Sequence, residues 1–547
     1  MEKLKQLLAI SKLSQKDSKW IHRDIFRILN KTDIWIAAYE KLKNNKSALT
    51  SGSIPKTIDG MSLDKLKRLK HLVYIEKYKF KPVKLNNIPV VKGKRKSLSR
   101  PTINDKIVQE VIRMILEAIY EPIFSEFSFG FRSGFGCHDA LDHVKRKFRW
   151  VDYVIKEDIE QAYPTIDHHT LVKILKKRID DPRFIRLIWK LLGCNVLNEE
   201  RIIWSKIGLT QGSIVSPILM NIYYHELDDF VQRLKKDWET SNSNKNNLKS
   251  PKYKSLEYKI NQVHGKLKLF ESYSSEYQKF AKELKVLRTE YMTLTVSKNK
   301  RTRIEYVRYA DHWMIGTSGD RKLAFDIKEQ VINFMKNNLV QKPHLIKTTN
   351  LRKGNAHFLG YEIFLPRNIS ISKFKGKGVI TTQRGQPELR FDIPVAKIIK
   401  RYVKRGYFKQ LKDRVRPISK SSYSVLEDHV IVRNYRSIWL GLLNYYSGCT
   451  NRRRLQYIHY LLHMSCAMTL GHRHRISCSK IFKKHGKTLT VKVKHTDKTI
   501  SFPYKTNWKL SEKKWLCGKE VIIPTHLYPN LISGSFLDLP YAICDSD

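Results

Sequence analysis

The sequence predicts an α+β fold for this chain of 547 residues, and three features carry the prediction. Residues 303–317 hold two apolar runs with two-residue alternation, separated by a polar tip. Short apolar segments alternate with helical patterns between about residues 150 and 230, and a long amphipathic segment covers residues 104–121. Alternation with period two indicates strands, and a period near 3.6 indicates helices.

The segment 303–317 predicts a β-hairpin. Its two apolar arms flank a tight tip that reads Tyr309-Ala-Asp-His312. A short polar turn between two alternating runs is typical of a hairpin. We therefore expect Asp311 to lie at the turn, with His312 beside it.

Residues 104–121 give the clearest helical pattern of the chain. Apolar residues recur on one face at helical spacing, and Pro122 ends the segment. Asn104 or Asp105 is the expected N-terminal cap, because short polar side chains accept the free N–H groups of a first turn.

The remainder of the chain divides by composition. Residues 236–302 are polar and charged, which predicts an insertion within the α+β region. After Pro366 the sequence is strongly basic and helical up to about Lys487. Strand-like alternation returns at Thr488.

The charge balance indicates a polyanionic partner. Lys and Arg number 104 against 51 Asp and Glu, which gives a net charge of +53. A generally solvated cationic surface is the alternative, but 41% hydrophobic residues exclude a disordered basic tail. A membrane partner is not expected, since acidic and basic residues interrupt the most apolar stretch, residues 107–123.

Cysteine usage and the N-terminal residues restrict the compartment. The 7 cysteines are scattered and form no CxxC pair, which favours a reducing environment over disulfides or a structural zinc site. The first residues form a poor secretory signal and a poor transit peptide. If the protein works in an organelle, it is expected to be made there.

Two aspartates are candidates for metal-assisted chemistry. Asp158 ends a short apolar strand pattern, with Tyr163 five residues later, and Asp311 lies at the predicted turn. Nucleotidyl transfer uses two Mg²⁺ ions held by carboxylates from separate strands. For either residue alone, a solvated strand end is the ordinary explanation.

A glycine-containing loop lies between these aspartates. The segment 208–221 contains Gln211 and Gly212 and leads into an apolar helix at Ser216-Pro217. Gly212 would let the backbone approach a bound nucleotide or template closely. The loop indicates a nucleotide site only because it lies between Asp158 and Asp311 in the sequence.

Together these segments resemble the group II intron-encoded proteins, the reverse transcriptase/maturase family, over nearly the whole chain. The hairpin is similar to the family's Tyr-Ala-Asp-Asp motif, and further similar segments are 80–84, 101–110, 130–134, 208–221, 358–362, 435–446 and 465–475. The resemblance implies a right-hand fingers–palm fold followed by a mainly α-helical thumb, the maturase or X domain. It also implies binding to the host intron RNA.

The resemblance divides the chain into four regions. Residues 1–79 would form the N-terminal region and the start of the fingers, and 80–370 the fingers and palm with the insertion 236–302. Residues 371–490 would form the X domain, and 491–547 the remnant of a DNA-binding region. The last residues resemble only the opening of the family's endonuclease module, so no endonuclease activity is expected.

Several positions depart from the family pattern at the implied polymerase site. His312 replaces the second aspartate, and imidazole is a poorer ligand than carboxylate for Mg²⁺. Lys96 replaces a triphosphate-facing arginine and loses the bidentate fork. Phe129, Ser133 and Phe135 stand where the family usually has a His, a Pro and an Arg. Residues 344–346 stand where the family usually has an acidic residue followed by Lys and Thr. We expect the polymerase activity to be lost, and Mg²⁺ to be required only if some remains.

The resemblance assigns nucleotide binding to Lys96, Tyr163, Gln211 and Gly212, and metal binding to Asp158 and Asp311. In contrast to the altered polymerase site, the basic residues expected to bind RNA are retained, because Lys and Arg recur at helical spacing after Pro394. The candidate RNA-binding residues are Lys397, Lys400, Arg401, Lys404, Arg405, Arg436, Arg473, Arg475, Lys483 and Lys484. Five tyrosines could stack on unpaired bases (Tyr435, Tyr445, Tyr446, Tyr457 and Tyr460), although core packing is expected for most of them.

The sequence therefore predicts a maturase that binds the RNA of a group II intron and assists splicing. A working RNA-directed DNA polymerase that tolerates His312 is the alternative, and a decayed reading frame without activity is a third. We expect a mitochondrial location, with the chloroplast as the alternative. A homodimer is left open.

Overall fold

The computed structural model describes most of the chain. The described residues are 5–43, 58–91, 94–157, 163–194, 196–198, 201–203, 208–210, 212–242, 251–267, 269–271, 274–293, 303–341, 346–366, 371–376, 379–384, 388–412, 414–493, 496–503 and 515–517. Of the predicted site residues, Asp158 and Gln211 lie outside these ranges. None of the described helices combines the length and the apolar character that crossing a membrane requires.

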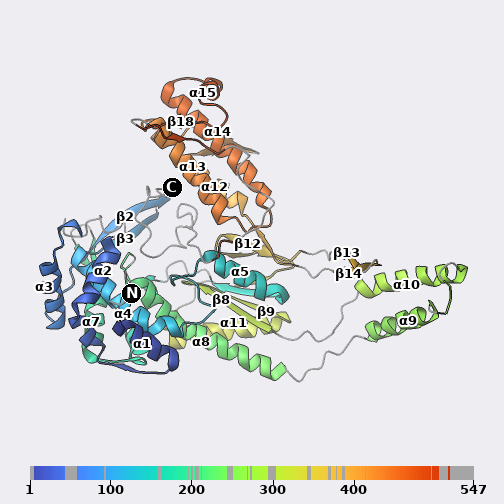
Figure 1. Cartoon of the computed structure of the whole chain (residues 1–547), viewed down its shortest axis with the longest axis horizontal. Coiled ribbons are helices and arrows are strands. Elements are labelled where there is room, and N and C mark those ends of the chain that lie inside the picture. The colour runs from blue at the N-terminus through green and yellow to red at the C-terminus, as the bar shows by residue number, and fades with distance from the viewer. Residues whose placement is uncertain are drawn as a thin grey trace.

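A four-stranded antiparallel sheet forms the centre of the molecule (Figure 1). Its strands, in sheet order, are β10 (Ile346–Asn350), β4 (Tyr153–Glu157), β9 (His312–Ser318) and β8 (Arg303–Tyr309). Tyr309 pairs with His312, so Ala310 and Asp311 alone form the turn between β8 and β9. The predicted hairpin, with Asp311 at its turn, is confirmed.

Helices on one side of this sheet share its apolar core. They include α4 (Ile103–Tyr120), α6 (His168–Lys176), α8 (Ser216–Asn242) and α11 (Arg321–Asn338). The predicted helix at residues 104–121 is confirmed as α4, but the predicted cap is wrong. Thr102 caps it, because its hydroxyl accepts the N–H of Asp105 at 3.3 Å. The Asp105 carboxylate instead accepts hydrogen bonds from Thr102 and Tyr78.

The N-terminal residues and the segment after α6 pack together at one end of the molecule (Figure 1). Their helices are α1 (Lys5–Lys16), α2 (Thr32–Lys43), α3 (Leu63–Tyr74) and α7 (Pro182–Leu192). A second sheet has the order β3 (Lys94–Arg100), β2 (Val83–Val91), β6 (Val196–Asn198), β7 (Arg201–Ile203). A short parallel pair joins β1 (His22–Arg23) to β5 (Ile179–Asp180). Lys96 lies on β3 opposite Ile88.

The segment predicted as an insertion contains two helices that pack on each other. They are α9 (Pro251–Leu267) and α10 (Ser275–Thr293), and Figure 1 shows them projecting far from the central sheet. The rings of Tyr253 and Tyr291 lie 4.4 Å apart between them. Helix α8 extends to Asn242, so position 236 lies within a palm helix.

The C-terminal part is mainly helical and stands above the central sheet in Figure 1. Its helices are α12 (Val395–Lys404), α13 (Asp428–Tyr445), α14 (Leu455–His474) and α15 (Cys478–His485). A small sheet of β11 (Ala356–Phe358), β12 (Tyr361–Phe364) and β15 (Arg390–Asp392) supports them. The two-stranded pairs are β13 (Ile371–Gly376) with β14 (Val379–Arg384), β16 (Phe408–Gln410) with β17 (Val415–Pro417), and β18 (Val491–Lys492) with β19 (Thr499–Ile500).

His138 joins the palm to this C-terminal part. It lies on α5 (Cys137–Lys147), which shares an apolar core with α13 and α14. Its Nε2 lies 2.8 Å from the carbonyl oxygen of Tyr445, and its Nδ1 accepts the N–H of Leu516 at 3.0 Å. Because Nδ1 accepts, Nε2 carries the proton and donates to Tyr445. One neutral imidazole thus connects three segments distant in sequence.

Candidate functional site

The hairpin turn holds Asp311 in a largely buried position. Asp311 is 4% exposed, and the Nε2 atom of His312 lies 3.8 Å from one oxygen of its carboxylate. Ala310 adopts a left-handed conformation with φ of 58°, which is costly for a residue with a side chain. The guanidinium of Arg308 donates to the carbonyl of Ala310 at 2.9 Å and holds the turn in this conformation.

Gly130 packs directly beneath this turn. A Cβ atom on Gly130 would lie 2.2 Å from the backbone nitrogen of Ala310, a distance that no side chain could occupy. Backbone hydrogen bonds run from Phe129 to Arg308 at 2.9 Å and from Arg308 to Phe127 at 2.8 Å. The Gly130-Phe-Arg segment therefore acts as a support for the hairpin.

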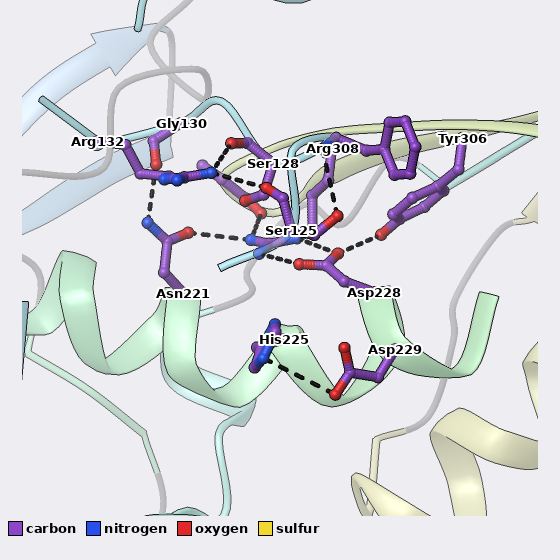
Figure 2. A network of polar contacts seen from close by, with 12 residues as sticks. Ser125, Ser128, Gly130, Arg132, Asn221, His225, Asp228, Asp229, Tyr306 and Arg308 are labelled. Carbon is purple, nitrogen blue, oxygen red and sulfur yellow. Dashed lines mark hydrogen bonds and ion pairs between the residues drawn. The ribbon is translucent and has the colours of Figure 1, made fainter. Parts of the chain in front are cut away.

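A fully buried ion pair anchors the hairpin to α8 (Figure 2). Arg308 and Asp228 are both 0% exposed, and Arg308 donates from Nε at 2.7 Å and from Nη2 at 2.6 Å to the two carboxylate oxygens. The hydroxyl of Tyr306 donates to the same carboxylate at 2.7 Å. Burial alone would lower the pKa of Arg308, but the Asp228 carboxylate raises it, so the guanidinium stays charged.

Asn221 extends this network to the Gly130 segment. Its side-chain oxygen accepts from Arg308 at 2.9 Å, and its side-chain nitrogen donates to the carbonyl of Gly130 at 2.8 Å. We call Tyr306, Arg308, Asp228, Asn221 and Gly130 the Arg308 network. Figure 2 shows that α8 supplies two of these side chains along one face, directed at the hairpin.

The glycine-containing loop docks on the segment that follows β4. Gly208 donates to Ile166 at 2.8 Å, and Leu209 donates to Tyr163 at 2.7 Å. Gly208 has a φ of 98°, and a Cβ there would lie 2.8 Å from Pro164. Gly212 has a φ of 101°, which also favours glycine. The structure thus brings Tyr163 and the Gly212 loop together, although the Tyr163 ring is 1% exposed and packs in the core.

The end of β4 lies beside the hairpin. Lys156 pairs with Met314, and the indole of Trp313 donates to the carboxylate of Glu157 at 3.1 Å. Burial raises the pKa of Tyr224 on α8 well above its usual value, and the charges of Asp311 and Glu157 raise it further. The hydrogen bond between Trp313 and Glu157 places the end of β4 two residues from Asp311 along the hairpin. Asp158 is the next residue in sequence after Glu157.

Among the described residues, the hairpin contributes one of the two carboxylates predicted to bind magnesium, since Asp158 lies outside the described ranges. Mg²⁺ prefers oxygen ligands, and this site offers the Asp311 carboxylate beside the His312 imidazole. Throughout the described ranges, no group of three or more His, Cys, Asp or Glu side chains is placed to hold a metal. The metal-binding roles of Asp158 and Asp311 remain predictions, as do the nucleotide-binding roles of Lys96, Tyr163, Gln211 and Gly212.

The predicted basic stripe is an exposed face of α12. Ile398, Ile399 and Tyr402 are buried on the inner side of this helix. On the outer side, Lys397, Lys400, Lys404 and Arg405 are exposed and Arg401 is half-buried. We call these five residues the α12 basic face.

Some of the other predicted RNA-binding residues are exposed to solvent, and others are engaged in contacts within the protein. Arg475, Lys483 and Lys484 are exposed around α15. The guanidinium of Arg473 lies 2.9 Å from the Asp428 carboxylate, and Arg436 donates to the carbonyl of Ser501 at 3.0 Å. Arg473 and Arg436 thus have structural partners, whereas the exposed residues present their charge to solvent.

Sequence patterns did not predict the Arg308 network. One signal was present, because Arg308 interrupts an apolar strand pattern between Val307 and Tyr309. A charged residue in a buried strand needs a buried partner of opposite charge. Periodicity does not identify that partner, since Asp228 lies 80 residues away on another element.

Two family models match the chain in the order of its two parts. The reverse transcriptase (RNA-dependent DNA polymerase) family matches residues 82–246, and the type II intron maturase family matches residues 386–518. The first match includes Asp228 and Asn221 of the Arg308 network. The second includes the α12 basic face, α13, α14 and α15.

Curated relatives resemble the chain over most of its length. It is 33% identical over 475 residues to the group II intron-encoded protein LtrA of Lactococcus lactis subsp. cremoris, covering 86% of this chain and 78% of the relative. It is 30% identical over 541 residues to the uncharacterized 91 kDa protein in cob intron of Schizosaccharomyces pombe, covering 96% and 64%. It is 32% identical over 497 residues to the putative COX1/OXI3 intron 1 protein of Saccharomyces cerevisiae, covering 89% of this chain and 57% of the relative. The chain spans less than two thirds of the two yeast relatives.

Replacing Asp228 with Asn should destabilise the protein strongly. The substitution leaves the Arg308 guanidinium charged and buried without its counterion, which costs roughly 3–5 kcal/mol of unfolding free energy. Denaturant unfolding of the variant measures this loss. The matched control is Asp180→Asn, which breaks the exposed pair with Arg23 and should cost less than about 1 kcal/mol. Equal effects of both substitutions would contradict the central role of the buried pair.

His143 on α5 should make stability depend on pH. It is 8% exposed, its ring lies 5.4 Å from the rings of both Phe127 and Phe129, and burial lowers its pKa from 6.5 to about 4. The unfolded chain therefore binds a proton below pH 6.5 that the folded chain does not bind, so stability is lost as the pH falls from 6.5 towards 4. The loss attributable to His143 is roughly 3 kcal/mol.

Unfolding measured at several pH values between 4 and 7 tests this dependence. His143→Gln should flatten part of it, whereas His264→Gln, at an exposed position on α9, should leave it unchanged. Burial also lowers the pKa of His22, His138 and His463, so a remaining dependence is expected. An identical pH profile for both variants would show that His143 is not the source.

Proposed function

This chain belongs to the group II intron-encoded reverse transcriptase/maturase family, and from that premise we propose that it binds the RNA of a group II intron and assists its splicing. The observation that carries the proposal is the α12 basic face, which lies within the region matched by the maturase family. The net charge of +53 supports a polyanionic partner of large extent.

The protein would act by binding rather than by its own chemistry. Cleavage and ligation belong to the RNA, and the protein contributes the difference between its affinity for the active RNA fold and for misfolded forms. Arg and Lys side chains that neutralise phosphates release counterions, so binding should weaken steeply with salt. Exposed cations on one helical face suit this role because they can follow a phosphate backbone.

We further propose that the chain has lost polymerase activity. His312 stands where the family has a second carboxylate, and Lys96 stands where the family has an arginine. The alternative is a working RNA-directed DNA polymerase in which Asp158 and Asp311 suffice and His312 is tolerated. The intact Arg308 network favours neither alternative, because it supports the hairpin without contributing a ligand.

The setting we propose is an organelle, with the protein encoded there. Relatives from introns of cob and COX1 support this setting. We propose the mitochondrion and keep the chloroplast as the alternative. We also propose a homodimer as the form of assembly that sedimentation would test.

Neutralising the α12 basic face should abolish assistance of splicing. The variant Lys397→Gln/Lys400→Gln/Lys404→Gln should bind intron RNA more weakly, and each lost phosphate contact should reduce the salt slope of binding by about 0.7–0.9. Splicing of the intron transcript and filter binding over a range of salt concentrations measure both effects.

The control is Lys259→Gln/Lys282→Gln/Lys285→Gln, which removes the same charge from exposed positions on α9 and α10. It should retain splicing assistance. Normal splicing with the α12 variant would contradict the proposal. No splicing assistance by the unaltered chain would favour the decayed reading frame.

Primer extension on an RNA template separates the maturase from the polymerase. We expect the natural chain to give no product with either Mg²⁺ or Mn²⁺. A His312→Asp variant that gains activity would locate the defect at this position, and a silent one that still binds intron RNA would implicate Lys96 and the other departures. Extension by the natural chain would establish the polymerase alternative.

A further inference from the structure

One open face runs along α14, a helix that is otherwise buried. Its inner residues, including Leu455, Ile458, Leu461 and Leu462, are fully buried in the core. The open face contains Tyr457 (45% exposed) and Tyr460 (54% exposed), with Met464 and Met468 half-buried further along and Arg453 exposed just before the helix. We call these five residues the Tyr457 face.

The structure separates these two tyrosines from the other three aromatic candidates. Tyr435, Tyr445 and Tyr446 are 0% exposed, as the sequence predicted for most of the set. Their hydroxyls have partners, which include Ser465 for Tyr435, at 2.8 Å, and the backbone of 359–360 for the other two. Core packing thus accounts for these three tyrosines. It does not account for Tyr457 and Tyr460, whose rings remain exposed on α14.

The Tyr457 face ends at a depression of about 650 Å³. Its lining includes Met468, Gly471, His472, Arg475 and Ser477, so α14 continues directly into it. Gly471 is required here, since a Cβ would lie 2.7 Å from the carbonyl oxygen of Ile476. Arg475 is exposed at the end of α14, and the side chain of His472 lies 3.3 Å from the Ser419 hydroxyl.

Cations stand at both ends of this face. Arg453 and Arg454 are exposed before α14, and Arg475 is exposed after it. Asp428, an acidic residue near the second end, already pairs with Arg473 at 2.9 Å and with His474 at 2.8 Å. Between these two ends, α14 is roughly 30 Å long at 1.5 Å per residue. Two aromatic rings therefore lie between two positively charged ends.

We propose that the Tyr457 face binds an unpaired segment of the intron RNA. The proposal rests on the function proposed above and names the form of RNA that this surface takes. Bases stack on Tyr457 and Tyr460, which lie three residues apart on one side of the helix. Phosphates lie near Arg453 and Arg454 at one end and near Arg475 at the other.

The chemistry of the face favours unpaired RNA over other partners. In a duplex the bases are already stacked on one another, so exposed rings gain little from it, whereas unpaired bases can stack on tyrosine. The basic ends and the net charge of +53 oppose docking of a second copy of this chain. Single-stranded RNA satisfies both the aromatic and the cationic parts of the surface.

The test compares two RNA probes by fluorescence anisotropy at several salt concentrations. One is a labelled single-stranded oligoadenylate of roughly ten nucleotides, within the range of known single-strand sites, and the other is a duplex of the same length. The variant Tyr457→Ala/Tyr460→Ala should weaken oligoadenylate binding roughly tenfold for each ring. Duplex binding and the salt slope should stay unchanged, because no phosphate contact is removed.

Two controls accompany the alanine variant. Tyr457→Phe/Tyr460→Phe keeps both rings and should bind like the natural chain. Tyr258→Ala removes a ring that is 65% exposed on α9 and should have no effect. Together they show that stacking rings at these two positions, rather than hydroxyls or exposed tyrosines in general, account for the loss.

Several results would overturn the proposal. These are unchanged oligoadenylate affinity in the alanine variant, an equal loss for the duplex, and a loss of self-association in sedimentation with RNA binding intact. Each leaves the maturase function standing if the chain still binds the intron transcript and assists splicing. Failure of the unaltered chain in those two assays would instead reject the maturase function itself.

Discussion

The buried ion pair between Arg308 and Asp228 constrains the whole palm. Two charges removed from water carry a large desolvation cost, which good geometry and complete hydrogen bonding must offset. Arg308 meets this condition by donating to Asp228, to Asn221 and to the carbonyl of Ala310. Two of these partners lie on α8 and the third lies in the turn, so the β8–β9 hairpin, its turn and α8 must be placed together. Displacing any one of them would leave a buried polar group without its partner.

The same constraint explains how the hairpin can persist without its second carboxylate. The Arg308 network contacts the turn through Arg308 and Gly130, and none of its hydrogen bonds involves the side chain of residue 312. A substitution at 312 therefore changes the donor set at the tip and leaves the supports of the tip in place. Support of the hairpin and the identity of the side chain at 312 are therefore separate properties of this palm.

The C-terminal part depends on the palm for its position. His138 on α5 donates to the backbone of α13 and accepts from Leu516, and the rings of Tyr361 and Tyr445 pack 5.7 Å apart in the core that both parts share. The basic and aromatic faces of α12 and α14 are thus attached to the palm through a packed apolar core. RNA bound at these faces would meet a surface whose orientation relative to the palm is fixed by that packing.

Sequence alone determined the elements with strong local patterns and the chemical class of the partner. Period-two alternation predicted the hairpin at Asp311, helical periodicity predicted α4 and the α12 basic face, and the charge balance indicated a polyanion, because each is a property of neighbouring residues or of composition. Tertiary structure decided the rest. It paired Arg308 with Asp228, moved the cap of α4 to Thr102, engaged Arg473 with Asp428, and left Tyr457 and Tyr460 exposed while burying Tyr435. Those outcomes depend on which distant side chains meet in space, and local periodicity carries no information about such contacts.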